Sequence, residues 1–355
     1  MLAATVSLCA LPTAIAALRG SEARASPSAL LTKVIASGAV EYEGYAESNA
    51  RFPLPEVPRA ERVLDLLGER VRMRVWWKSP TAWRADELGI IGEHDTYRDR
   101  AGLWVWDSER RAATRVGGIP TVRFPRASDL LPPELGRRLA AAARPSEISR
   151  LPSRVVGGIG AAGIRLTPST SETTVDHVDM WVDPESGLPL SVEITPRMSD
   201  TPIITSTFLE LNLRPPDPEV VHFQPPADAA VNFTEASDFA QAVDRYSPFV
   251  LPESIDGRSL RSSVAGAAGS YGDGFELIAV LALSEHHSPF DDDEMTQVPT
   301  SVGPWGTAHV VETPLLNGMT FEQDGITYVL GGTVPIETLE ETAVLLAAED
   351  VGPRR

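Results

Sequence analysis

The chain has 355 residues, a length for which two domains are expected, and its 43% hydrophobic and 23% charged residues are typical of a globular protein. Its formal net charge of −18 argues against nucleic acid as a partner of the whole chain. The charge is uneven: residues 232–355 carry 5 basic and 20 acidic side chains, whereas residues 51–154 carry 20 basic and 14 acidic ones. This asymmetry fits simple solubility and contact between lobes, or else a basic face that meets anionic lipid or an acidic partner.

Residues 1–25 are expected to be a signal peptide or a membrane anchor. Leu2–Leu18 is apolar, and Ala23-Arg24-Ala25 has the small-x-small pattern of a cleavage site. No Lys or Arg precedes the apolar run, unlike in an ordinary signal peptide. Two alternatives therefore stay open: the given start lies inside a longer gene product, or the stretch is the tail of a membrane anchor. The expected location is extracytoplasmic, in the cell envelope. The single cysteine, Cys9, lies in this leader, so the mature chain would have no disulfide, thiol nucleophile or cysteine metal site.

Residues 26–231 are expected to form one domain of short strands joined by tight turns. Helical periodicity appears at Ser28–Ser37 and Leu135–Ala143, with a further helical turn at Arg62–Leu67. Two-residue alternation predicts strands at Val40–Ser48, Arg70–Trp77, Ala82–Leu88, Tyr97–Arg100, Leu103–Asp107, Arg154–Val156, Gly163–Thr167 and Ile203–Leu213.

The clearest hairpin covers residues 178–194. Val178, Met180 and Val182 alternate with polar or aromatic neighbours, and Asp183-Pro184-Glu185-Ser186-Gly187 supplies turn chemistry before a return strand. Hairpins outnumber helices, so the sheet should be antiparallel.

Residues 232–355 are expected to form a smaller, acidic α+β domain. The predicted helices are Glu235–Val243 and Pro335–Ala347, and the predicted strands are Phe275–Leu283, His309–Thr313, Leu316–Glu322 and Ile326–Leu330. The proline-rich stretch Arg214–Val231 separates the two domains.

The glycine pattern Gly158-x-Gly160-x-x-Gly163 matches dinucleotide binding only if a helix follows it. The alternation of Ile164–Thr167, stopped by Pro168, predicts a strand instead, which leaves the glycines as a flexible hairpin loop. No cofactor is expected.

Other reactive candidates are weak. His286-His287 with Asp291–Glu294 lacks the spacing of a metal loop and indicates a solvated acidic loop, so no metal is expected. Ser270 lacks the glycine two residues earlier that a nucleophile elbow needs. The remaining histidines are scattered singly, as expected for surface or partly buried side chains: His94, His177, His222 and His309. The sequence therefore predicts that the protein is not an enzyme, with an envelope hydrolase as a distant alternative.

Six of the seven tryptophans precede residue 232, on predicted strands. Singly, each is best explained as ordinary core. Together, on a sheet too curved to fill its own face, they would line an apolar groove for acyl chains or an apolar peptide segment. The candidate cavity residues are Val71, Met73, Val75, Trp77, Trp83, Trp104, Trp106, Met180 and Trp181.

Several runs resemble actinobacterial members of the LolA-like superfamily, which includes the lipoprotein carrier LolA and the sigma-E regulatory protein RseB/MucB. The similar runs are Met73–Pro80, Leu103–Asp107, Ile164–Pro168, Val178–Leu190, Phe223–Ala227, Thr313–Leu316 and Gly325–Pro335. The resemblance implies an α+β fold: a strongly curved, unclosed antiparallel half-barrel covered by helices, with a smaller C-terminal domain.

In that superfamily the cavity takes acyl chains of lipids or lipoproteins, and the RseB branch also binds a membrane-bound anti-sigma factor. The resemblance therefore implies a non-enzymatic binding protein, with an RseB-like regulator as the alternative. No lipoprotein-transfer residue of LolA matches a position of this sequence.

Overall fold

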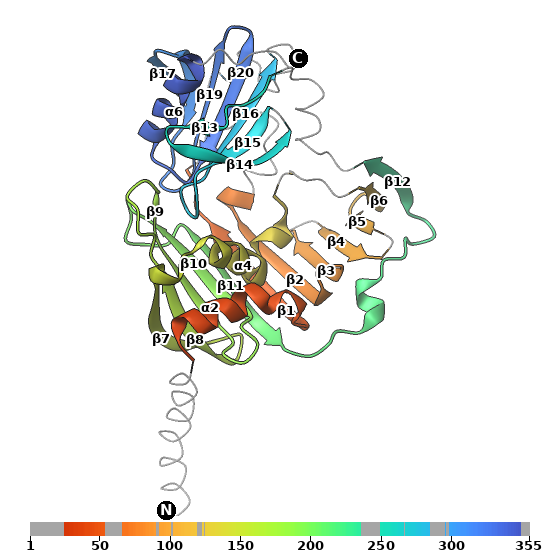
Figure 1. Cartoon of the computed structure of the whole chain (residues 1–355). Coiled ribbons are helices and arrows are strands. Elements are labelled where there is room, and N and C mark those ends of the chain that lie inside the picture. Colours follow the sequence, from red (N-terminus) through yellow and green to blue (C-terminus); the bar gives the residue numbers. More distant parts are fainter. Residues whose placement is uncertain are drawn as a thin grey trace, which may run out of the picture.

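The structure is a computed structural model that describes residues 25–53, 66–89, 92–100, 102–118, 123, 125–235, 249–265, 267–284, 295 and 298–348, with side chains of 262–265 left out. It has two β-sheets, one above the other in Figure 1, with few helices. The protein is therefore mainly β rather than the expected α+β. Short segments such as Ala112–Gly117 and Arg258–Ala265, in which no strand was predicted, pair as strands.

The larger sheet has twelve strands in the order β12-β6-β5-β4-β3-β2-β1-β11-β10-β9-β8-β7. They are β1 (Tyr42–Ala50), β2 (Arg70–Ser79), β3 (Ala82–Leu88), β4 (Glu93–Asp99), β5 (Gly102–Asp107), β6 (Ala112–Gly117), β7 (Ile148–Val156), β8 (Ile159–Leu166), β9 (Val175–Val182), β10 (Pro189–Pro196), β11 (Ile204–Asn212) and β12 (Ala230–Glu235).

The sheet is mixed, because β12 runs parallel to β6 whereas the other neighbours are antiparallel. The expectation of a wholly antiparallel sheet was wrong here for a topological reason. After β11, which lies inside the sheet, the chain does not form another hairpin. It runs to the edge of the sheet next to β6 and adds β12 there (Figure 1). This strand extends the first sheet to Glu235, past the boundary expected at residue 231.

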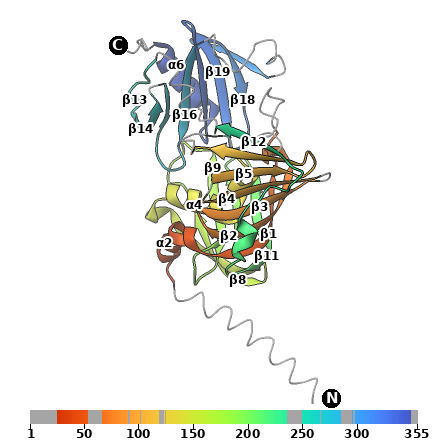
Figure 2. The same ribbon diagram turned by 90° about the vertical axis from the view of Figure 1, so that its right-hand side faces the viewer.

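One face of this sheet, called the helix face, is covered by α2 (Pro27–Ala36), α4 (Pro132–Ala142) and the short 3-10 helix η2 (Ala127–Leu130). Figure 2 shows α2 and α4 together on one flank of the strands. Gly136 permits the close approach of α4, since a Cβ there would lie 2.7 Å from the ring of Pro189 and 3.3 Å from Met180 Sδ. α2 buries Leu30 and Val34 in the same layer.

The opposite face, called the strap face, is partly covered by residues 213–229, which connect β11 to β12 and are called the strap. Phe223 of the strap packs against the rings of Tyr97, Trp104 and Trp106, with centroids 4.7, 5.3 and 6.2 Å away. Arg111 then holds Asp228 by an ion pair of 2.6 Å just before β12 begins.

The β7–β8 hairpin folds back over the sheet. Gly157 and Gly158 form its turn with positive φ, and Gly157 lies against Leu211 and Phe208 of β11, although β8, β9 and β10 stand between β7 and β11 in the sheet. The loop expected at Gly158–Gly163 is thus only a tight turn. Residues 159–166 continue as a strand, which supplies no helix N-terminus for a nucleotide.

The second sheet is antiparallel, in the order β13-β14-β15-β16-β20-β19-β18-β17. Its elements are β13 (Ser254–Ile255), β14 (Arg258–Ala265), β15 (Ala268–Tyr271), β16 (Ile278–Ser284), β17 (Thr300–Gly303), β18 (Gly306–Val311), β19 (Asn317–Gln323), β20 (Ile326–Gly332) and α6 (Ile336–Ala348). Leu339, Ala343 and Leu346 of α6 are buried against this sheet, as the apolar stripe predicted.

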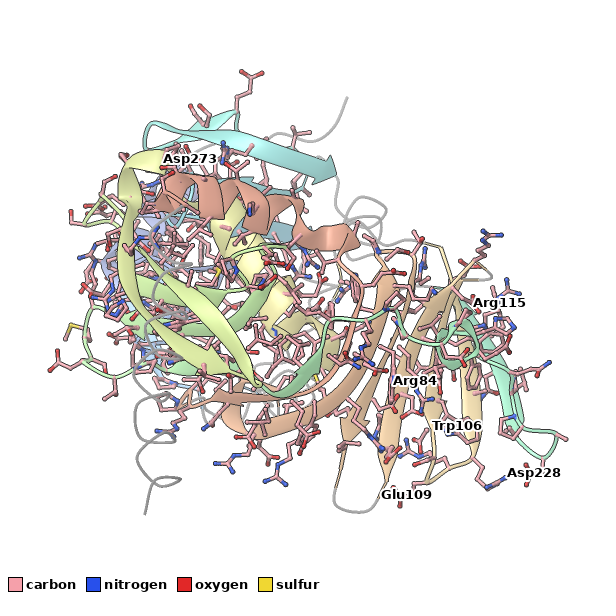
Figure 3. The ribbon with its side chains drawn as sticks, turned by 90° about the horizontal axis from the view of Figure 1, so that it is seen from below. Arg84, Trp106, Glu109, Arg115, Asp228 and Asp273 are labelled. Carbon is pink, nitrogen blue, oxygen red and sulfur yellow. The ribbon has the colours of Figure 1, made fainter. Side chains whose placement is uncertain are left out.

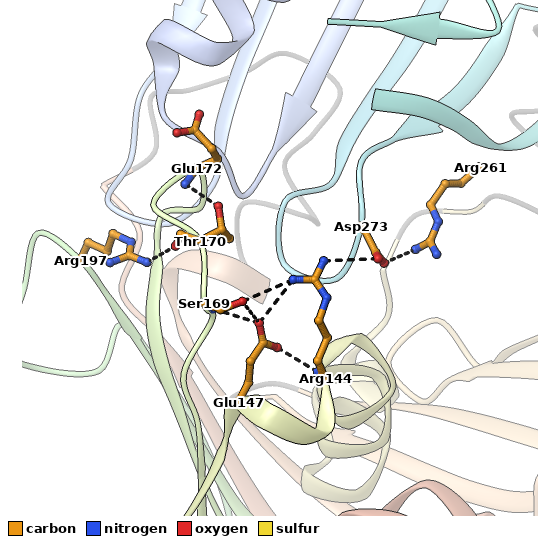
Figure 4. A network of polar contacts seen from close by, with 8 residues as sticks. All are labelled: Arg144, Glu147, Ser169, Thr170, Glu172, Arg197, Arg261 and Asp273. Atoms are coloured by element: carbon orange, nitrogen blue, oxygen red, sulfur yellow. Dashed lines mark hydrogen bonds and ion pairs between the residues drawn. The ribbon is translucent and has the colours of Figure 1, made fainter. Parts of the chain in front are cut away.

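The two sheets meet through hydrogen bonds of Thr173 and Thr174. The hydroxyl of Thr173, which is fully buried, lies 2.8 Å from the carbonyl oxygens of both Phe275 and Thr333, and the hydroxyl of Thr174 donates to Leu315 O at 2.6 Å. Around them, Figure 4 shows a polar rim in which Asp273 joins Arg144 at 3.4 Å and Arg261 at 2.6 Å. The junction is therefore a packed and hydrogen-bonded interface.

Most predicted elements of the first sheet are present within a few residues of their expected bounds. The helix predicted at Glu235–Val243 lies almost wholly outside the described residues, as do most of the leader, His286-His287 and Asp291–Glu294, and residues 62–65 of the predicted helical turn.

Candidate ligand-binding site

A row of side chains crosses the helix face from β1 to β6. Cross-strand pairing places Tyr42 opposite Trp77, Trp77 opposite Trp83 and Trp83 opposite Arg98. The row continues from Arg98 to Leu103 and from Leu103 to Val116. The first three rings are stacked, with centroid distances of 6.1 and 5.8 Å. Such pairs stabilise a sheet and form a continuous apolar surface.

This row ends in two adjoining cavities of about 240 and 310 Å³. The smaller is lined by Pro80, Trp83, Arg98, Leu103, Val116, Gly118, Arg123 and Arg126. The larger is lined by Arg98, Gly102, Arg115, Val116, Gly117, Gly118 and Phe233. The shared residues Arg98, Val116 and Gly118 connect the two. Their combined lining mixes apolar side chains with four arginines, so a ligand bound here would meet both apolar and cationic groups.

The arginines of this site differ in their partners. Arg123 forms a double ion pair with the buried Asp129, at 2.6 and 2.8 Å. Arg98 and Arg126 form no ion pair with any described residue. Burial and repulsion from Arg123 and Arg98 lower the pKa of Arg126 to about 10, although Asp129 opposes the change. The site therefore holds positive charge that the described part of the chain does not neutralise.

The nine predicted cavity residues are divided between the two faces. Val71, Met73, Val75, Trp77, Trp83 and Met180 lie on the helix face, whereas Trp104, Trp106 and Trp181 lie on the strap face. Of the nine, Trp83 lines a cavity and Trp77 stacks on it. Whether any of them contacts a ligand stays a prediction.

The other predicted residues fill packed core. Val71, Met73 and Val75 are buried in one cluster with Leu130 and Leu131. Met180 lies under α4.

The strap-face tryptophans are also enclosed. Trp104 and Trp106 pack on Phe223. Trp181 donates its indole N–H to Pro152 O, and the guanidinium of Arg154 lies 3.4 Å from its ring centroid. These rings therefore anchor the strap and the folded-back strand β7.

Sequence reasoning missed the arginines and the small residues of the site, namely Arg98, Arg115, Arg123, Arg126, Gly102, Gly117 and Gly118. The available signal was the basic surplus of residues 51–154. Spacing could not show which arginines face the cavity, because Arg123 and Arg126 enter it from outside the sheet.

A second titratable cluster lies on the strap face, near Arg84 in Figure 3. Asp86 and Asp95 are opposite each other on β3 and β4 and are 1% and 4% exposed. Arg84 binds Asp86 through two hydrogen bonds of 2.6 and 2.7 Å and reaches Asp95 at 3.3 Å. Burial and repulsion from Asp86 raise the pKa of Asp95 to about 7.

Glu93 completes a set of three carboxylates with Asp86 and Asp95 whose oxygens could approach a common cation. Arg84 and Arg74 already occupy this position, since Arg74 binds Glu93 at 2.6 Å. The guanidinium of Arg84 is also held between the rings of Trp76 and Tyr97, at 4.9 and 4.8 Å from their centroids. A metal would have to displace both arginines, so the arrangement is better explained as an ion-pair network.

The reactive candidates of the sequence do not assemble. Ser270 lies within β15, paired across to Ser262 and Ala279, and not at a strand-to-helix turn. Three histidines each face an aspartate on the surface: His94 with Asp107, His177 with Asp176, and His222 with Asp99.

Fold and site together define a two-sheet β protein with an amphipathic cavity at the end of an aromatic row. No protein-family model matches the sequence, and none of the curated proteins is significantly similar to it. Among solved structures, the fold is similar to that of MucB in the MucA/MucB complex of Pseudomonas aeruginosa. The TM-score is 0.51 at 15% identity, over 93% of this chain and all of that one.

A second structure of MucB, in complex with MucA(peri), gives a TM-score of 0.49 at 16% identity over 93% of this chain and all of that one. A LolA superfamily protein from Nitrosomonas europaea gives only 0.24 at 10% identity, over 56% of this chain and 98% of that one. The predicted similarity to MucB (RseB) is thus confirmed at the level of the fold. No helix among the described residues has the length and apolarity to cross a bilayer.

Proposed function

We propose that this protein is a non-enzymatic binding protein of the cell envelope, of the LolA/RseB type, which holds an acyl chain in a half-barrel. The observation that carries the proposal is the aromatic row Tyr42–Trp77–Trp83, which leads into the cavity beside Leu103 and Val116. An acyl chain in this cavity would bury its own apolar surface and that of Trp83, at about 25 cal/mol per Å². Tyr42 and Trp77 are already buried and support Trp83 from behind.

The binding of lipid requires an opening that the packed core lacks. The helix face is filled under α4, where Met180 meets Gly136, but open beside Trp83, which is only partly buried. We therefore place the chain at the β3–β6 end of the sheet rather than at Met73, Val75 or Met180. The residues proposed to contact it are Trp83, Leu103 and Val116, with Trp77 supporting Trp83.

The test is extraction of lipid from the purified protein followed by mass spectrometry, together with titration by a fluorescent fatty acid. Replacing Trp83 by Ala should weaken binding at least about tenfold, which corresponds to ~1.4 kcal/mol. Trp76→Ala is the matched control, because Trp76 is the neighbouring tryptophan that faces away from the cavity. Absence of co-purified lipid, with no thermal shift on addition of acyl ligands, would count against the proposal.

A second candidate is a regulator that binds a membrane-bound anti-sigma factor. It is favoured by the fold similarity to MucB, which is known in complex with MucA. The acidic residues 232–355 are the proposed partner surface. Pull-down with a co-encoded anti-sigma factor tests this, and binding that is indifferent to salt would contradict the role of charge. Export, with a leader in residues 1–25 that is cleaved or anchors the chain, belongs to both candidates.

A further inference from the structure

We propose that the cavity selects an amphiphile whose head group is anionic, a phosphate or a carboxylate, and that Arg98 and Arg126 bind this group. The inference rests on the proposed function and specifies the class of ligand. Arg98 and Arg126 would bind the head group of the ligand, whereas the aromatic row would contact its acyl chain.

The charge of the lining is the first observation. The formal net charge of the chain is −18, yet among the described residues four arginines and no carboxylate line the two cavities. These are Arg98, Arg115, Arg123 and Arg126. Asp129 neutralises Arg123, so the positive field that attracts an anion comes mainly from Arg98 and Arg126.

The second observation is a contrast among neighbouring arginines. Five nearby arginines each bind a carboxylate of the described chain: Arg74 with Glu93, Arg84 with Asp86, Arg111 with Asp228, Arg123 with Asp129, and Arg137 with Glu134. Arg98 and Arg126 have no such partner in the described residues, although both are partly buried. Leaving a partly buried guanidinium unpaired is unfavourable. The lowered pKa of Arg126 agrees with this, because burial and nearby arginines disfavour its charged form. A bound anion would stabilise that charged form.

The third observation is the position of Arg98 within the aromatic row. It lies directly between Trp83 and Leu103, so an anion on its guanidinium has apolar surface on both sides. Arginine binds phosphate and carboxylate through its planar fork of N–H donors, which suits a terminal head group. An acyl chain attached to that group can then lie along Trp83 or along Leu103 and Val116. A purely polar anion would leave these apolar surfaces unused.

The experiment compares probes with the same chain and different heads. Palmitate is compared with hexadecanol, phosphatidylglycerol with phosphatidylcholine of the same acyl composition, and inorganic phosphate serves as a head without a chain. Binding to the full-length mature protein is measured by displacement of a fluorescent fatty alcohol. The variants are Arg98→Gln and Arg126→Gln, and Arg110→Gln is the control because Arg110 is exposed on the β5–β6 turn, outside both cavities.

We expect the wild type to bind each anionic probe at least about tenfold more tightly than its neutral counterpart. Arg98→Gln and Arg126→Gln should each reduce the ratio of anionic to neutral binding to within about twofold, while Arg110→Gln keeps the preference of the wild type. Raised salt should reduce the preference for the anionic probes. A preference for palmitate alone identifies a carboxylate, and one for phosphatidylglycerol alone a phosphate.

Equal binding of anionic and neutral probes would overturn this inference and leave acyl-chain binding intact. Failure of hexadecanol as well as the anionic probes to bind would overturn the proposed function itself. Binding of an acidic peptide, with no binding of any lipid, would also overturn the inference, because it would assign the arginines to a protein partner.

Discussion

Replacement of Asp95 by Asn should stabilise the protein at neutral pH and leave it unchanged in acid. Asp95 is almost fully buried beside Asp86, and the two carboxyl groups share the single guanidinium of Arg84. Its Oδ1 has no hydrogen-bond partner among the described residues. Asparagine keeps the shape of the side chain and removes the charge that this position disfavours.

The magnitude follows from the pKa of Asp95, which burial and Asp86 raise from 3.8 to about 7 in the folded protein. Below about pH 4, folded and unfolded chains both hold the proton. Between pH 4 and 7 the unfolded chain releases it and the folded chain retains it, so the free energy of unfolding falls as pH rises. At 1.36 kcal/mol for each pH unit, the loss reaches about 4 kcal/mol at pH 7 and is constant above it.

The assay is urea denaturation followed by tryptophan fluorescence between pH 4 and 8, in the wild type and Asp95→Asn. The difference in unfolding free energy should grow from near zero to about 2–4 kcal/mol in favour of the variant, the lower figure allowing for movement of Arg84. Asp107→Asn is the control. A hydrogen bond from the backbone N–H of Arg110 lowers the pKa of Asp107, so this variant should be less stable than the wild type at neutral pH. Parallel curves for Asp95→Asn and wild type, or a less stable variant at pH 8, would refute the reasoning.

Two further changes test how the elements are joined. Gly187→Ala should destabilise the protein by about 2–4 kcal/mol in urea denaturation, because φ is +76° and the new Cβ would lie 2.6 Å from the carbonyl carbon of Lys33 in α2. Thr173→Val should cost about 1–3 kcal/mol and speed proteolysis between the sheets. The variant loses the single hydroxyl proton that Phe275 O and Thr333 O share and the oxygen that accepts from Val175 N. Unchanged protease resistance of this variant would mean that packing alone holds the junction.

The local pattern of the sequence predicted strands well where apolar and polar residues alternate. Residues 82–88, 178–182 and 326–330 are strands as expected, and both α2 and α6 begin within a residue of their predicted starts. β12 was missed because only Val231 and Phe233 alternate with polar neighbours, a pattern too short to indicate a strand, and in the structure all its residues are exposed. β6 was missed as well, and only Ala113 of this strand is buried.

The candidate site was predictable only in part, for a reason that lies in sheet geometry. Alternation shows that Trp77 and Trp76 face opposite ways, but it cannot show which face carries the cavity. The structure places Trp104 and Trp106 on the other face from Trp83, because cross-strand register depends on pairing between strands. The unpaired state of Arg98 and Arg126 depends in turn on tertiary contacts, since the nearby Asp129 pairs with Arg123 and Arg138 instead.

β1 lies in the middle of the twelve-stranded sheet, and this position limits the order in which the sheet can be completed. Glu43 of β1 faces Trp76 of β2 on one side and Asn212 of β11 on the other. A chain that emerges N-terminus first can pair β1 to β6 early, yet β1 keeps an open edge until residues 204–212 arrive. Contacts so distant in sequence close slowly, and an open edge of this length invites pairing with other chains. Folding of this protein should therefore be slow and prone to aggregation until β11 is in place.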